Sequence, residues 1–271
     1  MKLVFSLLFL FFSASVMAAT VDTVAIYSPT MKKSRKCVVI KPDYYQKKKK
    51  LYPVVYLLHG HGGDFSNWIK KVPAIKKYAD DFEVLIVCPD GDSSSWYIDS
   101  PVDKTMQFET YIAKEVTAFI DQHYRTIKSA AGRAVTGLSM GGHGALYVAF
   151  KNPSVFGACG SMSGGFNLIE TRHKYDLYKR IGDTTNMEAW KKYSMVNIAE
   201  TAKNDSLSII FDCGIKDQFF KSNKELHEKL LKAGIAHDYI ERPGNHSWSY
   251  WTNSLPYHLL FFKRHFDAKL K

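Results

Sequence analysis

The 271-residue sequence is poor in cysteine and contains neither an internal repeat nor a linker. Four cysteines are present, and none has C-x-x-C or zinc-site spacing, so a disulfide-rich scaffold and a zinc module are disfavoured. No Gly/Ser-rich, Pro-rich or low-complexity tract divides the chain. We therefore predict a single domain over residues 19–271. All four cysteines lie in apolar strand-like runs, which favours buried free thiols, although export would permit a disulfide.

Long hydrophobic runs are also absent beyond the first residues. The longest run, residues 3–12, is too short to span a bilayer securely. It follows Lys2 and precedes Val16-Met17-Ala18, an order of charge, apolar run and small residues that is typical of a secretory signal peptide. We predict a signal peptide over residues 1–18, cleavage after Ala18 or Ala19, and export to the periplasm or the medium without stable membrane insertion. The alternative is a buried N-terminal helix.

Acidic residues are fewer than basic ones. The chain has 26 Asp and Glu against 37 Lys and Arg, a formal net charge of +11. The basic excess is dispersed, apart from clusters at residues 32–36 and 47–50, and no nucleic-acid-binding motif accompanies it. We predict no nucleic-acid partner. The cluster at 47–50 lies between two strand-like runs and indicates a solvated hairpin loop.

Apolar strand-like runs alternate with helical patterns along the chain. This alternation predicts an α/β fold with a mostly parallel central sheet and helices on both faces. Strands are expected over residues 21–27, 37–41, 52–58, 84–88, 133–136, 157–162, 208–213 and 237–241, and helices over 66–78, 106–124, 140–150, 222–232 and 250–266. Residues 165–204 exceed a plain crossover, and their aromatic and basic content predicts a helical insertion over the active site. The alternative is a surface excursion without substrate contact.

A possible nucleophile lies where an apolar strand gives way to a helix. Gly137-Leu138-Ser139-Met140-Gly141 is a G-x-S-x-G sequence, and in a strand–turn–helix context it predicts the nucleophile elbow of serine hydrolases. The small flanking residues permit the tight turn, which projects the Ser139 hydroxyl above the sheet. The N–H of Met140, at the helix start, then points toward a developing oxyanion.

A serine nucleophile needs a histidine base and an acid that orients it. Asp217 and His246 both follow predicted strands downstream of Ser139, in the order serine, acid, histidine, so all three belong to one sheet edge. Asp217 could instead cap a helix, with Asp212 as the fallback acid. His246 could instead stack on Trp248.

A second oxyanion donor is expected in the glycine-rich stretch from Leu57 to Asp64, which follows a predicted strand. His59 and His61 in this stretch could suggest a metal site, but no third ligand has suitable spacing. We predict neither a metal nor an organic cofactor.

These motifs resemble those of the putative-esterase family of α/β-hydrolases, which includes esterase D, feruloyl and acetyl-xylan esterases, enterochelin esterases and mycolyltransferases. The matching segments span nearly the whole predicted mature chain: Tyr56-Leu57-Leu58-His59-Gly60, Ser95-Trp96-Tyr97, Gly137-Leu138-Ser139-Met140-Gly141-Gly142-His143-Gly144-Ala145, Cys213-Gly214-Ile215-Lys216-Asp217 and Gly244-Asn245-His246-Ser247-Trp248.

The resemblance implies an α/β-hydrolase fold and a catalytic triad of Ser139, Asp217 and His246. It further implies an oxyanion hole formed by two backbone N–H groups, and a loop near the substrate pocket. The oxyanion donors are His61 and Met140, and the loop residues are Trp96, Tyr97 and Asp99.

Within the family, Ser-Trp-Tyr and the N-terminal strands look most like the feruloyl and carbohydrate-esterase branch. We therefore expect an exported serine carboxylic-ester hydrolase that removes feruloyl or acetyl groups from plant polysaccharide. The open alternatives are an acyltransferase, an S-formylglutathione hydrolase-like esterase, a peptidase of related fold and a non-catalytic carbohydrate-binding protein. The sequence leaves the oligomeric state open.

Overall fold

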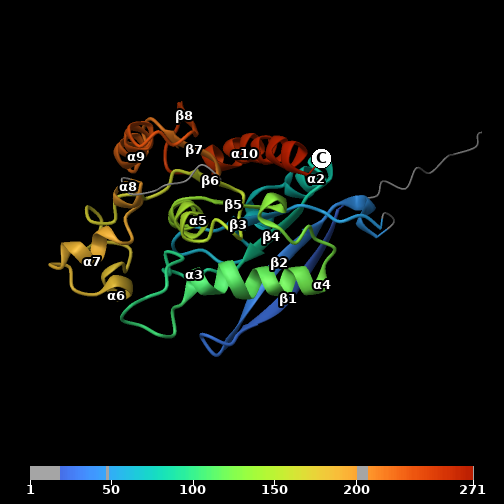
Figure 1. The fold of residues 1–271 in the computed structure, drawn as a ribbon, viewed down its shortest axis with the longest axis horizontal. Coiled ribbons are helices and arrows are strands. Elements are labelled where there is room, and N and C mark those ends of the chain that lie inside the picture. The colour runs from blue at the N-terminus through green and yellow to red at the C-terminus, as the bar shows by residue number, and fades with distance from the viewer. Residues whose placement is uncertain (1–18, 47–48, 200–206, 271) are drawn as a thin grey trace, which may run out of the picture.

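The computed structural model describes residues 19–46, 49–199 and 207–270 and centres on an eight-stranded sheet (Figure 1). The strands lie in the order β1-β2-β4-β3-β5-β6-β7-β8. Their bounds are β1 (Thr20–Ser28), β2 (Lys33–Lys41), β3 (Val54–Leu58), β4 (Leu85–Pro89), β5 (Arg133–Gly137), β6 (Ala158–Met162), β7 (Ser208–Gly214) and β8 (Asp238–Arg242). The strands from β4 to β8 are parallel, whereas β1 and β2 form an antiparallel pair that joins β4.

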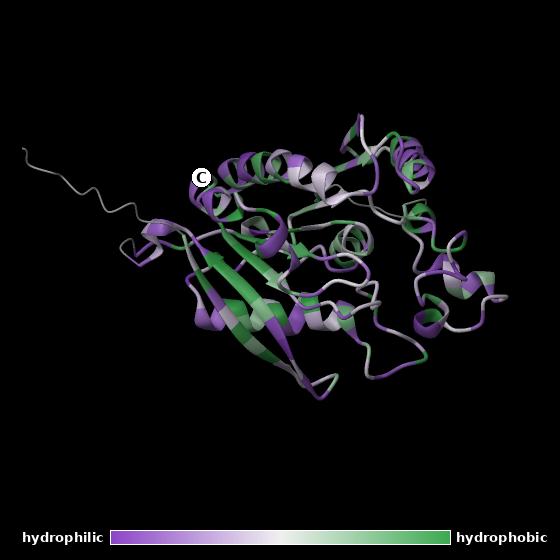
Figure 2. Ribbon diagram, turned by 180° about the vertical axis from the view of Figure 1, so that it is seen from behind, coloured by the Kyte–Doolittle hydropathy of each residue, from purple (hydrophilic) through white to green (hydrophobic). Residues whose placement is uncertain are grey.

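Helices cover both faces of this sheet. The longer helical segments are α1 (Asn67–Lys71), α2 (Ile75–Asp81), α4 (Thr117–His123), α5 (Met140–Lys151), α9 (Phe220–Lys232) and α10 (Trp248–Lys269). α3 (Phe108–Thr110) runs through a π-helical turn (Tyr111–Val116) into α4. One hydrophobic cluster includes side chains of α4, α5 and α9, and the other includes those of α1, α2 and α10. The strands between them are largely apolar (Figure 2). The predicted α/β class, with a mostly parallel sheet and helices on both faces, is confirmed.

Two local predictions were wrong. The single helix expected over residues 66–78 is divided into α1 and α2, because Pro73 has no N–H to continue the hydrogen-bond ladder. The strands on either side of the basic cluster at residues 47–50, of which 47 and 48 lie outside the described residues, do not form the expected hairpin, since β2 pairs with β1 and β4, whereas β3 pairs with β4 and β5. β4 therefore lies between β2 and β3 in the sheet.

The segment between β6 and β7 contains three short helices, α6 (Tyr178–Ile181), α7 (Met187–Lys191) and α8 (Met195–Ile198). In Figure 1 they lie at one end of the sheet, and α8 lies beside α5 and α9. The last part of the predicted insertion, residues 200–204, lies outside the described residues, as does the predicted signal peptide over residues 1–18. Within the described ranges, no helix combines the length and the apolar character that crossing a membrane requires.

Candidate active site

The strand–helix junction after β5 holds Ser139 in an uncommon conformation. Its φ is +55° and its ψ −117°, outside the regions that non-glycine residues usually occupy. The turn leaves no room for a side chain at Gly141, since an added Cβ would lie 2.5 Å from the carbonyl oxygen of His59. A Cβ on Gly137 would in turn lie 2.6 Å from the carbonyl oxygen of Gly141. The glycines therefore permit the turn, and Ser139 N donates to Met162 O at 3.0 Å to fix it.

Three loops at the carboxyl ends of parallel strands bring Ser139, His246 and Asp217 into one hydrogen-bonded chain. His246 Nε2 lies 2.9 Å from Ser139 Oγ, and His246 Nδ1 lies 2.8 Å from Asp217 Oδ2. Because a carboxylate only accepts, Nδ1 carries the imidazole proton, and Nε2 accepts from the serine hydroxyl. Asp217 Oδ1 also accepts from Phe219 N at 2.8 Å, so both carboxylate oxygens are engaged. The arrangement can deprotonate a serine as it attacks a carbonyl carbon.

Aromatic rings hold the histidine in place. The ring centroid of Trp251 lies 4.9 Å from that of His246, and that of Phe219 lies 5.2 Å away, both nearly perpendicular. The His246 side chain keeps 21% of its surface exposed, whereas that of Asp217 is fully buried. His246 is therefore accessible from solvent, whereas the Asp217 carboxylate is shielded from it.

The glycine-rich stretch after β3 turns its backbone toward the serine. Within the described residues, neither His61 N–H nor Met140 N–H donates to a protein acceptor. Adjacent bonds fix the turn, since Gly62 N donates to Ser93 O at 2.8 Å and Gly63 N donates to Gly60 O at 3.1 Å. Two backbone N–H groups near Ser139 thus have no protein acceptor among the described residues, and N–H groups of this kind can bind an oxyanion.

His59 has a backbone role in this stretch. Its Nε2 accepts from Gly91 N at 2.8 Å, and its Nδ1 donates to Gly60 O at 2.9 Å. Both ring nitrogens are thus occupied by the backbone. Among the residues that the structure describes, no group of three or more His, Cys, Asp or Glu side chains could hold a metal ion.

The site opens into a cavity of about 510 Å³. Its walls are mainly aromatic and polar: Gly60, His61, Asn67, Trp96, Leu138, Ser139, Tyr175, Gln218, Phe219, His246, Ser247, Trp248 and Trp251. Of the three residues expected near the substrate, only Trp96 is in this lining. Tyr97 is fully buried beneath it, where its hydroxyl donates to His59 O and accepts from His59 N. Asp99 instead accepts from Thr110 N and Thr110 Oγ1 at the start of the helix after β4.

Asp212, the fallback acid, lies in a separate network. Its side chain is fully buried and accepts from His258 Nε2 at 2.9 Å and from Ser254 Oγ, and it forms an ion pair with Arg242 at 3.3 Å. Burial alone would raise the pKa of Asp212, but the bonds from His258 and Ser254 and the charge of Arg242 hold it below its usual range. Asp212 therefore ties β7 to α10 and does not contact His246.

Comparison with known proteins identifies the family. The model of the family described as putative esterase matches residues 28–262. The chain belongs to the putative esterase family. An esterase of Mycobacterium tuberculosis is 29% identical over 77% of this chain, which spans only about half (51%) of that relative's length. The acetyl esterase of Caldicellulosiruptor saccharolyticus is 26% identical, with 83% of this chain and 91% of that protein covered.

A solved ferulic acid esterase structure has the same fold as this esterase-family chain. It superimposes with a TM-score of 0.79 at 26% identity, covering 91% of this chain and 99% of that one. The predictions of an α/β-hydrolase fold and of membership in a family of carboxylic-ester hydrolases are therefore confirmed.

Several wall residues of this esterase-family protein were not among the predicted site residues. Gln218 and Phe219 directly follow Asp217, and Ser247 and Trp248 directly follow His246, so adjacency along the chain could have indicated them. Tyr175 comes from the insertion, where no sequence pattern fixes which aromatic side chain faces the site.

Proposed function

We propose that the protein is an exported serine carboxylic-ester hydrolase that removes feruloyl or acetyl groups from plant polysaccharide. The observation that carries the hydrolase proposal is the hydrogen-bonded chain from Asp217 through His246 to Ser139. Membership in the putative esterase family and the aromatic wall of the cavity support it. The assignment of the acyl groups follows the similarity to an acetyl esterase and to a ferulic acid esterase.

The proposed reaction passes through an acyl-enzyme. His246 Nε2 takes the Ser139 proton as Oγ attacks the ester carbonyl carbon, and the oxyanion is held by the N–H groups of His61 and Met140. Each such donor contributes about 3 kcal/mol of barrier lowering in serine proteases. His246 then protonates the leaving alcohol, and the ester C–O bond breaks. Water attacks the acyl-enzyme with His246 as base, which releases the acid and restores Ser139.

The first test is release of ferulate and acetate from arabinoxylan, with methyl ferulate as a defined substrate, comparing wild type with Ser139→Ala. We expect the wild type to release one of the acids and the variant to lose at least 10³-fold in rate, roughly the contribution of an activated nucleophile. A fluorophosphonate probe should label the wild type and not the variant. Equal hydrolysis of p-nitrophenyl acetate by both proteins would overturn the hydrolase assignment, and activity on that ester alone would overturn the plant-polysaccharide assignment.

Acyl transfer is an outcome of the same assay. Added acceptor alcohols compete with water for the acyl-enzyme, so a transferase would give an ester product in place of the free acid.

The mass of the mature protein tests export. We expect the chain to begin at Ala19 or Thr20, and retention of Met1 in an exporting host would contradict the signal-peptide prediction.

A further inference from the structure

Tyr175 lies between two cavities. It lines the active-site cavity of about 510 Å³ and also a smaller neighbouring cavity of about 140 Å³, as do Gln218 and Phe219. Its ring centroid lies 5.6 Å from that of His61, 6.0 Å from that of Trp96 and 6.1 Å from that of Phe219. The Tyr175 ring is thus part of a partition, and its position limits how far the active-site cavity extends.

The backbone around this partition is in an unfavourable conformation. Tyr175 and Asp176 have φ values of +56° and +58°, and on the facing loop Trp96 and Tyr97 have +53° and +56°. Side chains with a Cβ rarely adopt this left-handed region, so surrounding contacts must hold both pairs in place. One such contact joins them directly, because Trp96 Nε1 donates to Tyr175 O at 3.2 Å.

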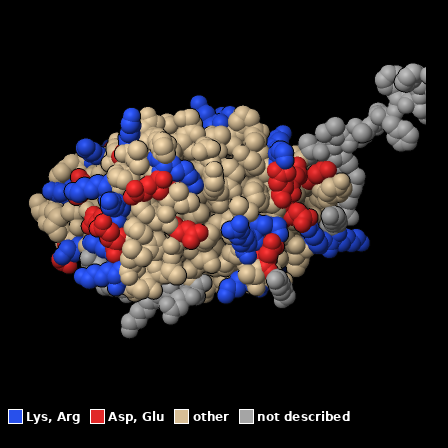
Figure 3. All heavy atoms as spheres, turned by 90° about the horizontal axis from the view of Figure 1, so that it is seen from above, with Lys and Arg blue, Asp and Glu red and all other residues tan. Residues whose placement is uncertain are grey.

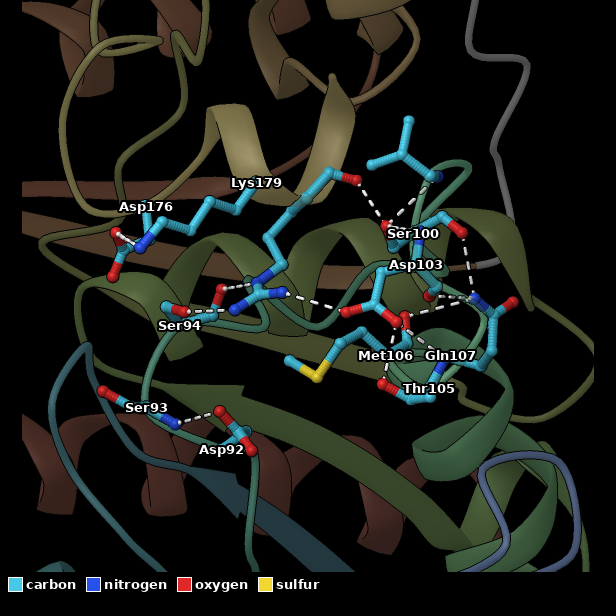
Figure 4. A network of polar contacts seen from close by, with 12 residues as sticks. Asp92, Ser93, Ser94, Ser100, Asp103, Thr105, Met106, Gln107, Asp176 and Lys179 are labelled. Atoms are coloured by element: carbon cyan, nitrogen blue, oxygen red, sulfur yellow. Dashed lines mark hydrogen bonds and ion pairs between the residues drawn. The ribbon is translucent and has the colours of Figure 1, made fainter.

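Arg180, in α6, makes further polar contacts between the insertion and the facing loop. Its Nε donates to Ser94 O at 3.2 Å, its Nη2 donates to Ser94 Oγ at 3.0 Å, and its Nη1 contacts Asp103 Oδ2 at 3.4 Å. Ser100 Oγ also donates to Arg180 O at 2.6 Å. Figure 4 shows Ser94, Ser100 and Asp103 along this loop, beside Asp176 and Lys179 of the insertion. The Arg180 side chain is only 14% exposed, whereas that of Asp103 is 35% exposed, so solvent screens the ion pair with Asp103 in part.

We propose that Arg180 is a positioning residue that sets acyl-chain selectivity by holding Tyr175 in the partition. Arg180 docks α6 on the loop that carries Trp96, and α6 begins three residues after Tyr175. When the contacts of Arg180 with Ser94 and Asp103 are lost, the strained backbone at Tyr175 can relax. The smaller cavity then becomes continuous with the active-site cavity. The proposal rests on the serine-esterase activity but not on the plant-polysaccharide assignment.

Tyr175 faces the acyl part of the ester. The leaving alcohol must lie beside His246, which protonates it, and Trp251 packs against that side of the ring. Tyr175 does not contact His246 itself; it contacts His61 and Trp96, on the side of the proposed oxyanion donor, and Phe219, which in turn contacts the His246 ring. Substrates that vary in acyl length with a constant alcohol therefore probe the partition.

The test compares kcat/KM for p-nitrophenyl octanoate with that for p-nitrophenyl acetate. Arg180→Met, which keeps the length of the side chain but none of its donors, should raise the octanoate-to-acetate ratio about tenfold, the effect of relieving a steric limit on a few methylenes. The change should appear as a lower KM for octanoate, with kcat for acetate within twofold of wild type. Arg180→Lys, which keeps a donor, should restore part of the wild-type ratio.

A double variant separates positioning from general loosening. Tyr175→Ala should raise the same ratio, and adding Arg180→Met to it should change the ratio no further, because both substitutions act through one ring. Arg172→Met is the matched control, since Arg172 lies in the same insertion but donates to Ile169 O within it. An unchanged ratio in Arg180→Met, or fully additive effects in the double variant, would overturn the inference. An inactive wild type would instead overturn the hydrolase proposal.

Discussion

Two aspartates on the same chain segment show how surroundings assign a role to a residue. Asp212 lies within β7 and Asp217 just beyond it, and both carboxylates accept a bond from a histidine. His258, the partner of Asp212, also contacts Thr136 Oγ1 at 2.9 Å and is fully buried, so no substrate can reach it. His246, the partner of Asp217, faces the cavity. Residue type and spacing alone could not separate the two pairs, because the distinction lies in what each histidine faces.

Exchanging each carboxylate for an amide should separate activity from stability. Asp217→Asn should lower kcat about 10⁴-fold, as the equivalent change does in serine proteases, because the amide favours the wrong tautomer of the His246 ring. The melting temperature should change little. Asp212→Asn should instead lower the free energy of unfolding by about 3 kcal/mol, because it breaks a buried charge network, with kcat retained. Urea denaturation and ester hydrolysis measured on both variants check this, and the opposite pattern would make Asp212 the catalytic acid.

The stabilisation by Asp212 depends on pH in a defined direction. Its pKa is lowered in the folded state, so its contribution is present above the ordinary Asp pKa of about 3.9 and is lost as the pH falls below it. The difference in unfolding free energy between wild type and Asp212→Asn should therefore shrink in acid. A constant difference from pH 7 down to pH 3 would contradict the assignment.

Tyr97 supports the proposed oxyanion loop from below. Tyr97→Phe removes the hydroxyl that pairs with both His59 N and His59 O, and leaving a buried group unpaired costs about 1–3 kcal/mol. We expect a lower unfolding free energy and a reduced kcat with little change in KM, because the loop acts on the transition state. Tyr27→Phe, at a tyrosine exposed on β1, is the control and should change neither quantity.

At the scale of elements, α5 links the nucleophile turn to the insertion. His143, one turn after Ser139, is buried, with Nε2 2.8 Å from Tyr193 O and Nδ1 3.2 Å from Trp96 O. Burial lowers the pKa of His143 to about 4, although both carbonyls favour the protonated ring. The side chain thus lies between α5, the loop before α3 and the chain between α7 and α8, and a neutral imidazole, which has one N–H, can donate to only one of the two carbonyls.

His143 should give the folded state a sensitivity to mild acid. Its folded pKa of about 4 lies below the value of about 6.5 in the unfolded chain, so its contribution to stability is full above pH 6.5 and declines as the pH falls toward 4. His143→Gln, which keeps a donor but cannot titrate, should reduce the slope of unfolding free energy against pH by up to about 1.4 kcal/mol per unit in this range. An unchanged slope would show that His143 does not titrate there.

At the scale of the whole molecule, charge and thiols are distributed without a single dominant feature. Seen from above, basic and acidic side chains are interspersed around a broad uncharged area (Figure 3). The four cysteines, Cys37, Cys88, Cys159 and Cys213, are free and buried in strands on both halves of the sheet, as their apolar surroundings in the sequence predict. Burial raises the pKa of every one of these thiols.

The thiols should therefore be inert until the protein unfolds. An aromatic disulfide reagent at neutral pH should modify none of them in the native state and all four in denaturant, because only an accessible thiolate reacts. Dithiothreitol should leave the melting temperature unchanged. If fewer than four thiols reacted in denaturant without a reducing agent, the protein would contain a disulfide instead.

The sequence predicted those parts of the structure best that depend on interactions between residues close together in the chain. The elbow around Ser139 and the strand ends before Asp217 and His246 follow from glycine placement and strand order, which act over a few residues. The position of β4 between β2 and β3 was missed because strand pairing is set by the whole sheet. The places of Tyr97 and Tyr175 were missed because each depends on packing between distant segments.

The position of β8 has a consequence for how the protein fails on heating. β8 pairs with β7 along one side and is only partly covered, yet His246 follows four residues after its end. Strands at the edge of a sheet detach at a lower free-energy cost than central strands do. We expect thermal inactivation to precede the loss of helical circular dichroism, so that the enzyme loses its base through fraying while most of its core is still folded.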